Sequence, residues 1–136
     1  MEKYIHKVKY YETDKMGITH HSNYIRWMEE ARIDFLDQAG LSYGFLESSG
    51  VLSPVVSVEC DFKSPTTFED EVEIEIKVEE FKGVRLIFSY LMTKRGSGEV
   101  ASTGKSVHCF TDKEGKLIIL KRTYPEFYEK IKRISE

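Results

Sequence analysis

A short segment without regular periodicity, residues 11–24, gathers the side chains best suited to catalysis. It holds one carboxylate, Asp14, and two adjacent imidazoles, His20 and His21, with Gly17 between them. A helical pattern begins directly after the histidines, and a helix N-terminus offers unpaired backbone N–H groups and a partial positive charge. Such groups can polarise a carbonyl, while an aspartate that folds back beside that carbonyl can act as a base or a nucleophile. Gly17 permits the tight turn that this arrangement needs.

The same residues have simpler interpretations. Asp14 could be a turn residue that accepts hydrogen bonds from nearby backbone N–H groups. Asp14, His20 and His21 could also bind zinc, since imidazoles and carboxylates are zinc ligands. Adjacent histidines rarely point the same way, however, and no third strong ligand lies nearby in the sequence. We therefore expect neither a metal nor another bound cofactor.

One long helical pattern follows the segment. Apolar residues recur three and four positions apart, which predicts an amphipathic helix with a wide buried stripe. Ser22 or Asn23 can serve as its N-cap, and Gly40 suits a left-handed stop. The stripe consists of Tyr24, Trp27, Met28, Ala31, Phe35 and Ala39.

Strands dominate the rest of the chain. Apolar and charged residues alternate with a period of two, and short turns rich in glycine separate the alternating runs. One helix and several antiparallel strands indicate an α+β fold in a single domain, residues 1–136, with the helix on the concave side of the sheet. The predicted strands are 4–10, 56–62, 71–79, 86–92 and 99–111; residues 116–120 extend the sheet or form an irregular edge, and 125–134 form a terminal helix.

The run from Tyr11 to Tyr24, Y-x-T-D-x-x-G-x-x-x-H-x-N-Y, continues to Glu29 and to Ala31-Arg32. This pattern resembles the hotdog-fold acyl-CoA thioesterases, in particular the group of the 4-hydroxybenzoyl-CoA and Tol-Pal-associated thioesterases. The resemblance is dense over residues 8–36. It implies a hotdog fold, in which an antiparallel sheet of about five strands wraps one long central helix and two protomers join their sheets edge to edge.

The resemblance also implies roles for individual residues. Asp14 would be the catalytic carboxylate, and the backbone N–H of His21 would polarise the thioester carbonyl while its imidazole lines the site. Asn23 and Tyr24 would shape the site around the substrate. The expected substrate-binding residues are Gly17, His20, Asn23, Tyr24 and Glu29, although Glu29 could equally pair with Arg26 or Arg32.

The expected reaction is hydrolysis of an acyl-CoA thioester to a free acid and coenzyme A. Asp14 could attack the carbonyl directly or deprotonate the attacking water, and the residues do not separate these routes. Two alternatives remain open: a hotdog dehydratase acting on 3-hydroxyacyl thioesters, and a non-catalytic protein that binds acyl-CoA or an acyl-carrier protein. The phosphates of coenzyme A could be bound by basic residues of two turns, Lys82 with Arg85 and Lys94 with Arg95.

Composition narrows the remaining function classes. The chain has 136 residues, with 20 basic and 23 acidic side chains and a net charge of −3. That charge argues against nucleic acid as a partner, and neither an apolar run of membrane-spanning length nor a signal peptide is recognisable. Cys60 and Cys109 stand apart, as expected for buried, reduced thiols. We expect a cytoplasmic protein whose long edge strands pair in a homodimer that associates further into a homotetramer.

Overall fold

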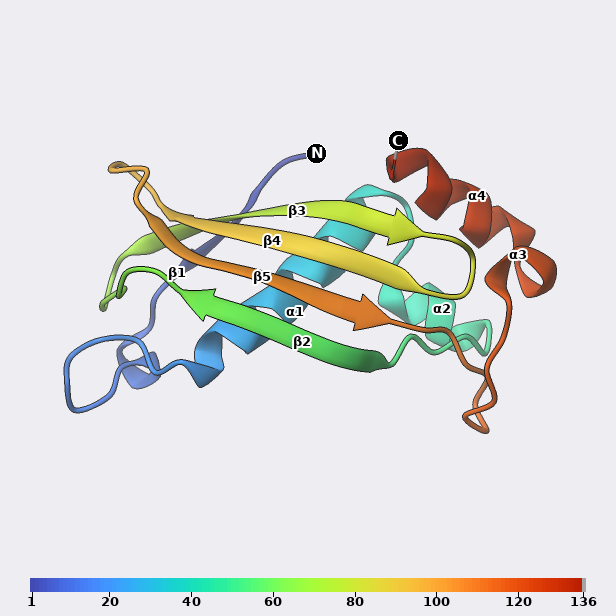
Figure 1. Cartoon of the computed structure of the whole chain (residues 1–136), viewed down its shortest axis with the longest axis horizontal. Coiled ribbons are helices and arrows are strands. Elements are labelled where there is room, and N and C mark those ends of the chain that lie inside the picture. The colour runs from blue at the N-terminus through green and yellow to red at the C-terminus, as the bar shows by residue number, and fades with distance from the viewer. Residues whose placement is uncertain (136) are drawn as a thin grey trace.

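The structure is a computed structural model that describes residues 1–135, apart from the side chain of Tyr43. Its core is one sheet of five antiparallel strands in the order β1-β3-β4-β5-β2 (Figure 1). The expected five-stranded antiparallel sheet is confirmed. The strands are β1 (Tyr4–Lys7), β2 (Val55–Phe62), β3 (Glu71–Phe81), β4 (Leu86–Lys94) and β5 (Val100–His108).

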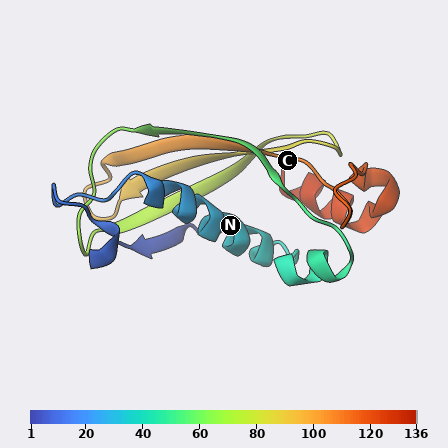
Figure 2. The ribbon, with the colours of Figure 1, turned by 90° about the horizontal axis from the view of Figure 1, so that it is seen from below.

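Helix α1 (Ser22–Gln38) lies against one face of this sheet, as the view from below shows (Figure 2). The predicted apolar stripe faces the sheet, and Trp27 and Met28 have no exposed surface. The helix N-cap is His21, so the prediction of Ser22 or Asn23 is wrong by one or two residues. Neither side chain caps the helix, because the Asn23 amide turns back to the preceding loop. Gly40 ends the helix with a positive φ of 79°, as predicted.

The helical content exceeds the one long helix and one terminal helix that were expected. The terminal helix α4 (Pro125–Ile134) has the predicted bounds and packs against the far end of the sheet, where Tyr128 contacts Phe81. Proline at the first helical position fits its start, because that position needs no N–H. Two short helices, α2 (Tyr43–Ser48) and α3 (Leu120–Thr123), were not predicted. No helix in residues 1–135 has the length and apolar character needed to cross a membrane.

The predicted strands differ from the structure mainly at their ends. The strand predicted for residues 4–10 stops at Lys7, and a 3-10 turn η1 (Tyr10–Glu12) follows, because the Glu12 carboxylate accepts the Lys9 N–H and bends the chain. β5 ends at His108 rather than Thr111. Thr111 instead forms isolated bridges with Leu52 and Leu117, and the latter is the irregular edge predicted for residues 116–120.

Candidate active site

The loop before α1 folds into a tight hairpin around Asp14. Thr13 and Thr19 form an isolated antiparallel bridge, and the Asp14 N–H donates to the Ile18 carbonyl at 2.9 Å. Gly17 turns the chain with a φ of 79°, a conformation that few other residues adopt readily. One carboxylate oxygen of Asp14, Oδ1, accepts the Met16 N–H at 2.8 Å. The turn-forming role is therefore real, but it occupies one oxygen and leaves Oδ2 without a hydrogen bond within the described chain.

The backbone at the start of α1 presents a free donor. The His20 N–H donates to the Glu12 carbonyl at 2.8 Å, and the Ser22 N–H donates to Nδ1 of His20 at 3.2 Å. Between them, the N–H of His21 has no acceptor among residues 1–135. It belongs to the N-cap of a helix of 17 residues, where the helix dipole adds a partial positive charge. This donor is suited to polarising a carbonyl oxygen.

Asp14 and His21 line the same open hollow, which has a volume of about 330 Å³. The structure therefore brings together the two residues predicted to be catalytic. Phe62, at the end of β2, forms a wall and packs edge-on against Tyr24 (ring centroids 5.2 Å apart) and His21 (6.1 Å). The full lining is Asp14, Met16, Ile18, Thr19, His21, Tyr24, Phe62, Lys63, Ser64 and Pro65.

Tyr24 lies in this lining as a neutral phenol. Its hydroxyl bonds to Oγ1 of Thr66 at 3.0 Å, and that oxygen contacts Oγ1 of Thr19 at 2.6 Å. Burial raises the pKa of Tyr24 above its ordinary value of 10.0, so the phenol keeps its proton at neutral pH. Tyr24 thus joins α1 to the loop and to the turn after β2.

The other predicted substrate-binding residues lie outside the lining of the hollow. The buried Asn23 amide donates to the carbonyls of Glu12 (3.0 Å) and His20 (3.2 Å), so it ties the loop to the helix. The exposed His20 ring stacks on His21 with centroids 4.3 Å apart. Gly17 forms the turn, and its carbonyl accepts the Thr67 hydroxyl.

Glu29 is exposed on α1 and also lies outside the lining of the hollow. It forms no ion pair with Arg26 or Arg32 in the described chain. Arg32 is instead buried and donates to the Tyr90 hydroxyl at 3.1 Å. Neither of the ion pairs considered for Glu29 is present.

The two basic turns lie at opposite ends of the sheet (Figure 1). Lys94 is the last residue of β4 and Arg95 follows it, at the same end of the sheet as Asp14. Lys94 pairs with Glu99 and Arg95 with Glu71, each at 2.8 Å. Lys82 and Arg85 lie beyond the other end of the eleven-residue strand β3, roughly 35 Å away along the strand. Of the two basic turns, the one with Lys94 and Arg95 lies at the end of the sheet that carries the hollow. Lys63, which the sequence did not single out, lines the hollow itself.

A buried carboxylate behind the loop was also missed. Glu12 accepts hydrogen bonds from Nε2 of His6 (2.8 Å), the Lys9 N–H (2.8 Å) and Nε1 of Trp27 (2.7 Å). Burial opposes its ionisation, but these three hydrogen bonds outweigh burial and lower the pKa of Glu12. The sequence offered only a weak signal, namely an acidic residue in an aperiodic segment just before the core helix.

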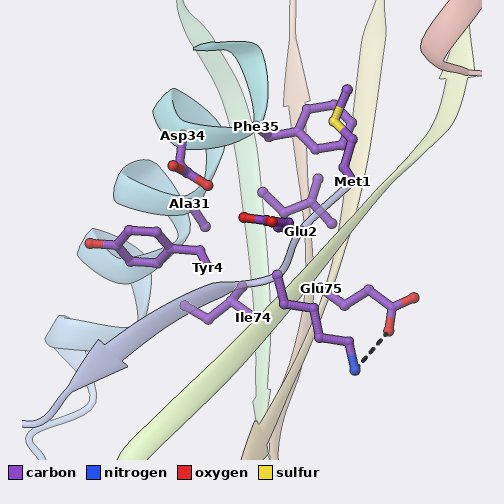
Figure 3. A pocket seen from close by; sticks show the side chains of 10 residues that line it. Met1, Glu2, Tyr4, Ala31, Asp34, Phe35, Ile74 and Glu75 are labelled. Atoms are coloured by element: carbon purple, nitrogen blue, oxygen red, sulfur yellow. Dashed lines mark ion pairs between the residues drawn. The ribbon is translucent and has the colours of Figure 1, made fainter. Parts of the chain in front are cut away.

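Two further hollows lie on the other side of α1. Figure 3 shows a small cavity of about 30 Å³ between the N-terminal segment, α1 and β3, with Tyr4, Phe35 and Glu75 around it. A groove of about 550 Å³ continues from it toward Arg133 in α4. Neither contains Asp14 or His21, and in residues 1–135 no three His, Cys, Asp or Glu side chains are grouped to hold a metal ion. We therefore place the candidate active site in the hollow beside Asp14.

Comparison with known proteins assigns the family. A Bacillus subtilis (strain 168) protein, YneP, which bears the provisional name acyl-CoA thioesterase, is 34% identical over 93% of this chain and 94% of its own. The acyl-CoA thioester hydrolase YbgC of Escherichia coli O6:H1 is 26% identical over 61% of this chain and 62% of its own. The solved structure of the DHNA-CoA thioesterase from Staphylococcus aureus superimposes with a TM-score of 0.93 at 30% identity, covering 98% of this chain and 89% of that one. Residues 8–135 match the thioesterase-like superfamily. The chain belongs to this superfamily and has its hotdog fold.

Proposed function

We propose that this protein hydrolyses acyl-CoA thioesters to a free acid and coenzyme A, with Asp14 and the His21 N–H as the catalytic groups. Its family makes the chain a thioester hydrolase. One observation carries the assignment of residues: a carboxylate with a free oxygen and an unpaired N–H at a helix N-terminus line one hollow. Neither of the two hollows on the other side of α1 contains Asp14 or His21.

The chemistry follows from that pairing. The thioester carbonyl oxygen accepts the His21 N–H, which stabilises the negative charge that develops on it; one such donor is worth about 10²–10³ in rate. Asp14 then acts through Oδ2 by one of two routes. It attacks the carbonyl carbon, expelling the thiolate and forming an anhydride that water cleaves, or it takes a proton from a water that attacks the same carbon. In both routes the products are a carboxylate and coenzyme A.

The substitution Asp14→Asn tests this assignment. The amide oxygen still accepts the Met16 N–H, so the turn should survive while the base or nucleophile is lost. We expect kcat to fall by about 10²–10⁴ with the fold retained, measured as thiol release and by circular dichroism. Asp37→Asn, on the exposed face of α1, is the matched control. Undiminished hydrolysis by Asp14→Asn would remove Asp14 from the mechanism.

Assays on a panel of thioester substrates separate hydrolysis from the two alternative functions. The panel contains short and long aliphatic acyl-CoAs, acyl-carrier-protein thioesters and 1,4-dihydroxy-2-naphthoyl-CoA, since relatives of that name match this chain at 26% identity. An enoyl thioester product from a 3-hydroxyacyl substrate would identify a dehydratase. Tight binding without turnover for every member would identify a binding protein.

Coenzyme A and a partner subunit are expected to complete the site. Lys94 and Arg95, at the same end of the sheet as the hollow, are the basic residues that we assign to the phosphates.

The outer edge of β2 carries the exposed residues Val55 and Val56 and ends at Phe62 in the hollow. Pairing of two β2 edges would cover these residues and place the hollow at a subunit boundary, in a homodimer that forms a cytoplasmic homotetramer. Sedimentation of Val56→Lys as a monomer and of the parent as an oligomer is the expected result.

A further inference from the structure

A cluster of titratable groups, in which His6 and Glu12 are buried, lies directly behind the loop that presents His21. His6 and Glu12 are 8% and 5% exposed, and Glu12 uses both carboxylate oxygens: Oε1 contacts His6 and Oε2 accepts from Trp27. On its other side, His6 contacts Glu30 through Nδ1 at 3.1 Å, and Glu30 also accepts the Tyr4 hydroxyl at 3.1 Å. The titratable groups that contact this histidine are therefore two carboxylates, one of which also binds a phenol.

Contacts at both ring nitrogens and on the ring face hold His6 in place. Nε2 contacts Glu12 at 2.8 Å, and Nδ1 contacts Glu30 at 3.1 Å. The ring also packs on Trp27, with centroids 4.5 Å apart. Because Trp27 donates to the same carboxylate, His6 and Trp27 together fix the Glu12 side chain between β1 and α1.

The cluster reaches the catalytic donor through the backbone of Glu12. The Glu12 carbonyl accepts the His20 N–H at 2.8 Å and the Asn23 amide at 3.0 Å. These two residues flank His21 closely, one immediately before it and one two positions after it. The position of Glu12 therefore sets the direction in which the His21 N–H points.

We propose that His6 and Glu12 are positioning residues, which hold the His21 N–H in line with the thioester carbonyl through the Glu12 backbone. The proposal rests on the proposed function of the hollow. A displacement of about 1 Å of a catalytic group can cost about 10² in rate, so a loose Glu12 acts on the chemical step more than on substrate binding. Neither residue lines the hollow.

Glu12→Gln in the full chain is the first test. Glu12 accepts hydrogen bonds from His6, Lys9 and Trp27 through its two carboxylate oxygens. In glutamine only the carbonyl oxygen accepts, so the substitution loses at least one of these bonds. We expect kcat for the best acyl-CoA substrate to fall by about 10–100-fold with KM within about twofold of the parent. The matched controls are Glu30→Gln, which leaves the His6–Glu12 bond in place and should have a smaller effect, and Asp37→Asn, which should have none.

His6→Gln is the second variant and keeps the proposal testable if Glu12→Gln does not fold. It retains a donor toward Glu12 but loses the contact with Glu30 and the packing on Trp27. His6→Gln should have a lowered kcat with KM within about twofold of the parent. Asp37→Asn, exposed on α1 and outside the cluster, should keep the parental kcat. Equal kcat in the parent and in folded His6→Gln would overturn the proposal.

Nuclear magnetic resonance tests the positioning role independently of thioester hydrolysis. Glu12→Gln should shift the His21 amide resonance relative to the parent, because the Glu12 carbonyl holds the residues that flank His21. A parent that cleaves no thioester would refute the proposed function, whatever these spectra show. An unmoved His21 amide, or unchanged kcat in folded Glu12→Gln, would refute the positioning role while leaving hydrolysis intact.

Discussion

Replacing Asn23 by aspartate should destabilise the protein in a manner that depends on pH. The amide of Asn23 is 7% exposed and donates to two carbonyls, those of Glu12 (3.0 Å) and His20 (3.2 Å). Aspartate has the same shape but, when ionised, only accepts hydrogen bonds. The substitution therefore replaces two attractive contacts by two repulsive ones at the start of α1.

The expected loss in the free energy of unfolding has two parts, the lost amide hydrogen bonds and the repulsion by the new carboxylate. Each carbonyl keeps one backbone donor, the His20 N–H for Glu12 and the Asn23 N–H for His20. Losing the amide alone, as in Asn23→Leu, should then lower the free energy of unfolding by about 1 kcal/mol. A buried carboxylate facing two carbonyl oxygens raises the cost to about 3 kcal/mol at pH 8. For 136 residues the second figure corresponds to a fall in Tm of roughly 10 °C.

The pH dependence has a definite sign. Repulsion makes the introduced carboxyl bind its proton more tightly in the folded protein than in the unfolded chain, and once protonated it donates one hydrogen bond again. The folded state then binds more protons, so the free energy of unfolding of Asn23→Asp rises toward that of the parent as pH falls from 8 to 5. Urea unfolding of the parent, Asn23→Asp and Asn23→Leu at both pH values measures this difference. Equal losses in the two variants, unchanged between pH 5 and 8, would refute the electrostatic reasoning.

Two further predictions concern the core. A Cβ added at Gly104 would lie 2.3 Å from the Met28 methyl and 2.7 Å from the Glu59 carbonyl, so Gly104→Ala should cost about 1–3 kcal/mol in urea unfolding. Adding Met28→Ala should fail to restore stability, because the backbone contact remains; full recovery would contradict this. Burial lowers the pKa of His108 from 6.5 to about 4, so the unfolded chain takes up a proton that the folded protein refuses, and stability is lost as pH falls through this range. His108→Gln can still accept a hydrogen bond from Ser106. Between pH 7 and 4, its free energy of unfolding should fall by roughly 2 kcal/mol less than that of the parent. Parallel plots of the free energy of unfolding against pH would exclude this role for His108.

The fold was predictable wherever one face of an element is buried and the other is solvated. Residues 71–79 of β3 alternate without interruption, and Val72 and Ile74 are buried as the period of two requires. β2 shows where the same pattern misleads. Val56 and Phe62 look like core positions in the alternation, yet they are 62% and 51% exposed, because this strand lies at the edge of the sheet. Alternation reveals which residues share a face, and it does not reveal what covers that face.

The residues of the candidate site were predictable where neighbours in the sequence define them, and not where distant residues do. Asp14 and His21 were found because a short loop and a helix N-terminus bring them together within eight residues of sequence. Glu12 was missed because its importance comes from His6 and Trp27, which reach it from a strand and from the second turn of the helix. A buried carboxylate has no periodic signature, and only its partners distinguish it from a solvated one.

The far wall of the hollow depends on a connection that the N-terminal motif does not contain. Thr66, between β2 and β3, is 1% exposed, and its carbonyl accepts the Thr19 N–H at 2.8 Å while its hydroxyl bonds to both Thr19 and Tyr24. None of these atoms belongs to the hydrogen-bond ladder of the sheet. A change at Thr66 would therefore alter the position of the loop and of Tyr24 without disturbing the strands. The motif of residues 11–24 thus specifies the reacting groups, whereas the connection between β2 and β3 sets the shape of the hollow and can change that shape while the motif stays the same.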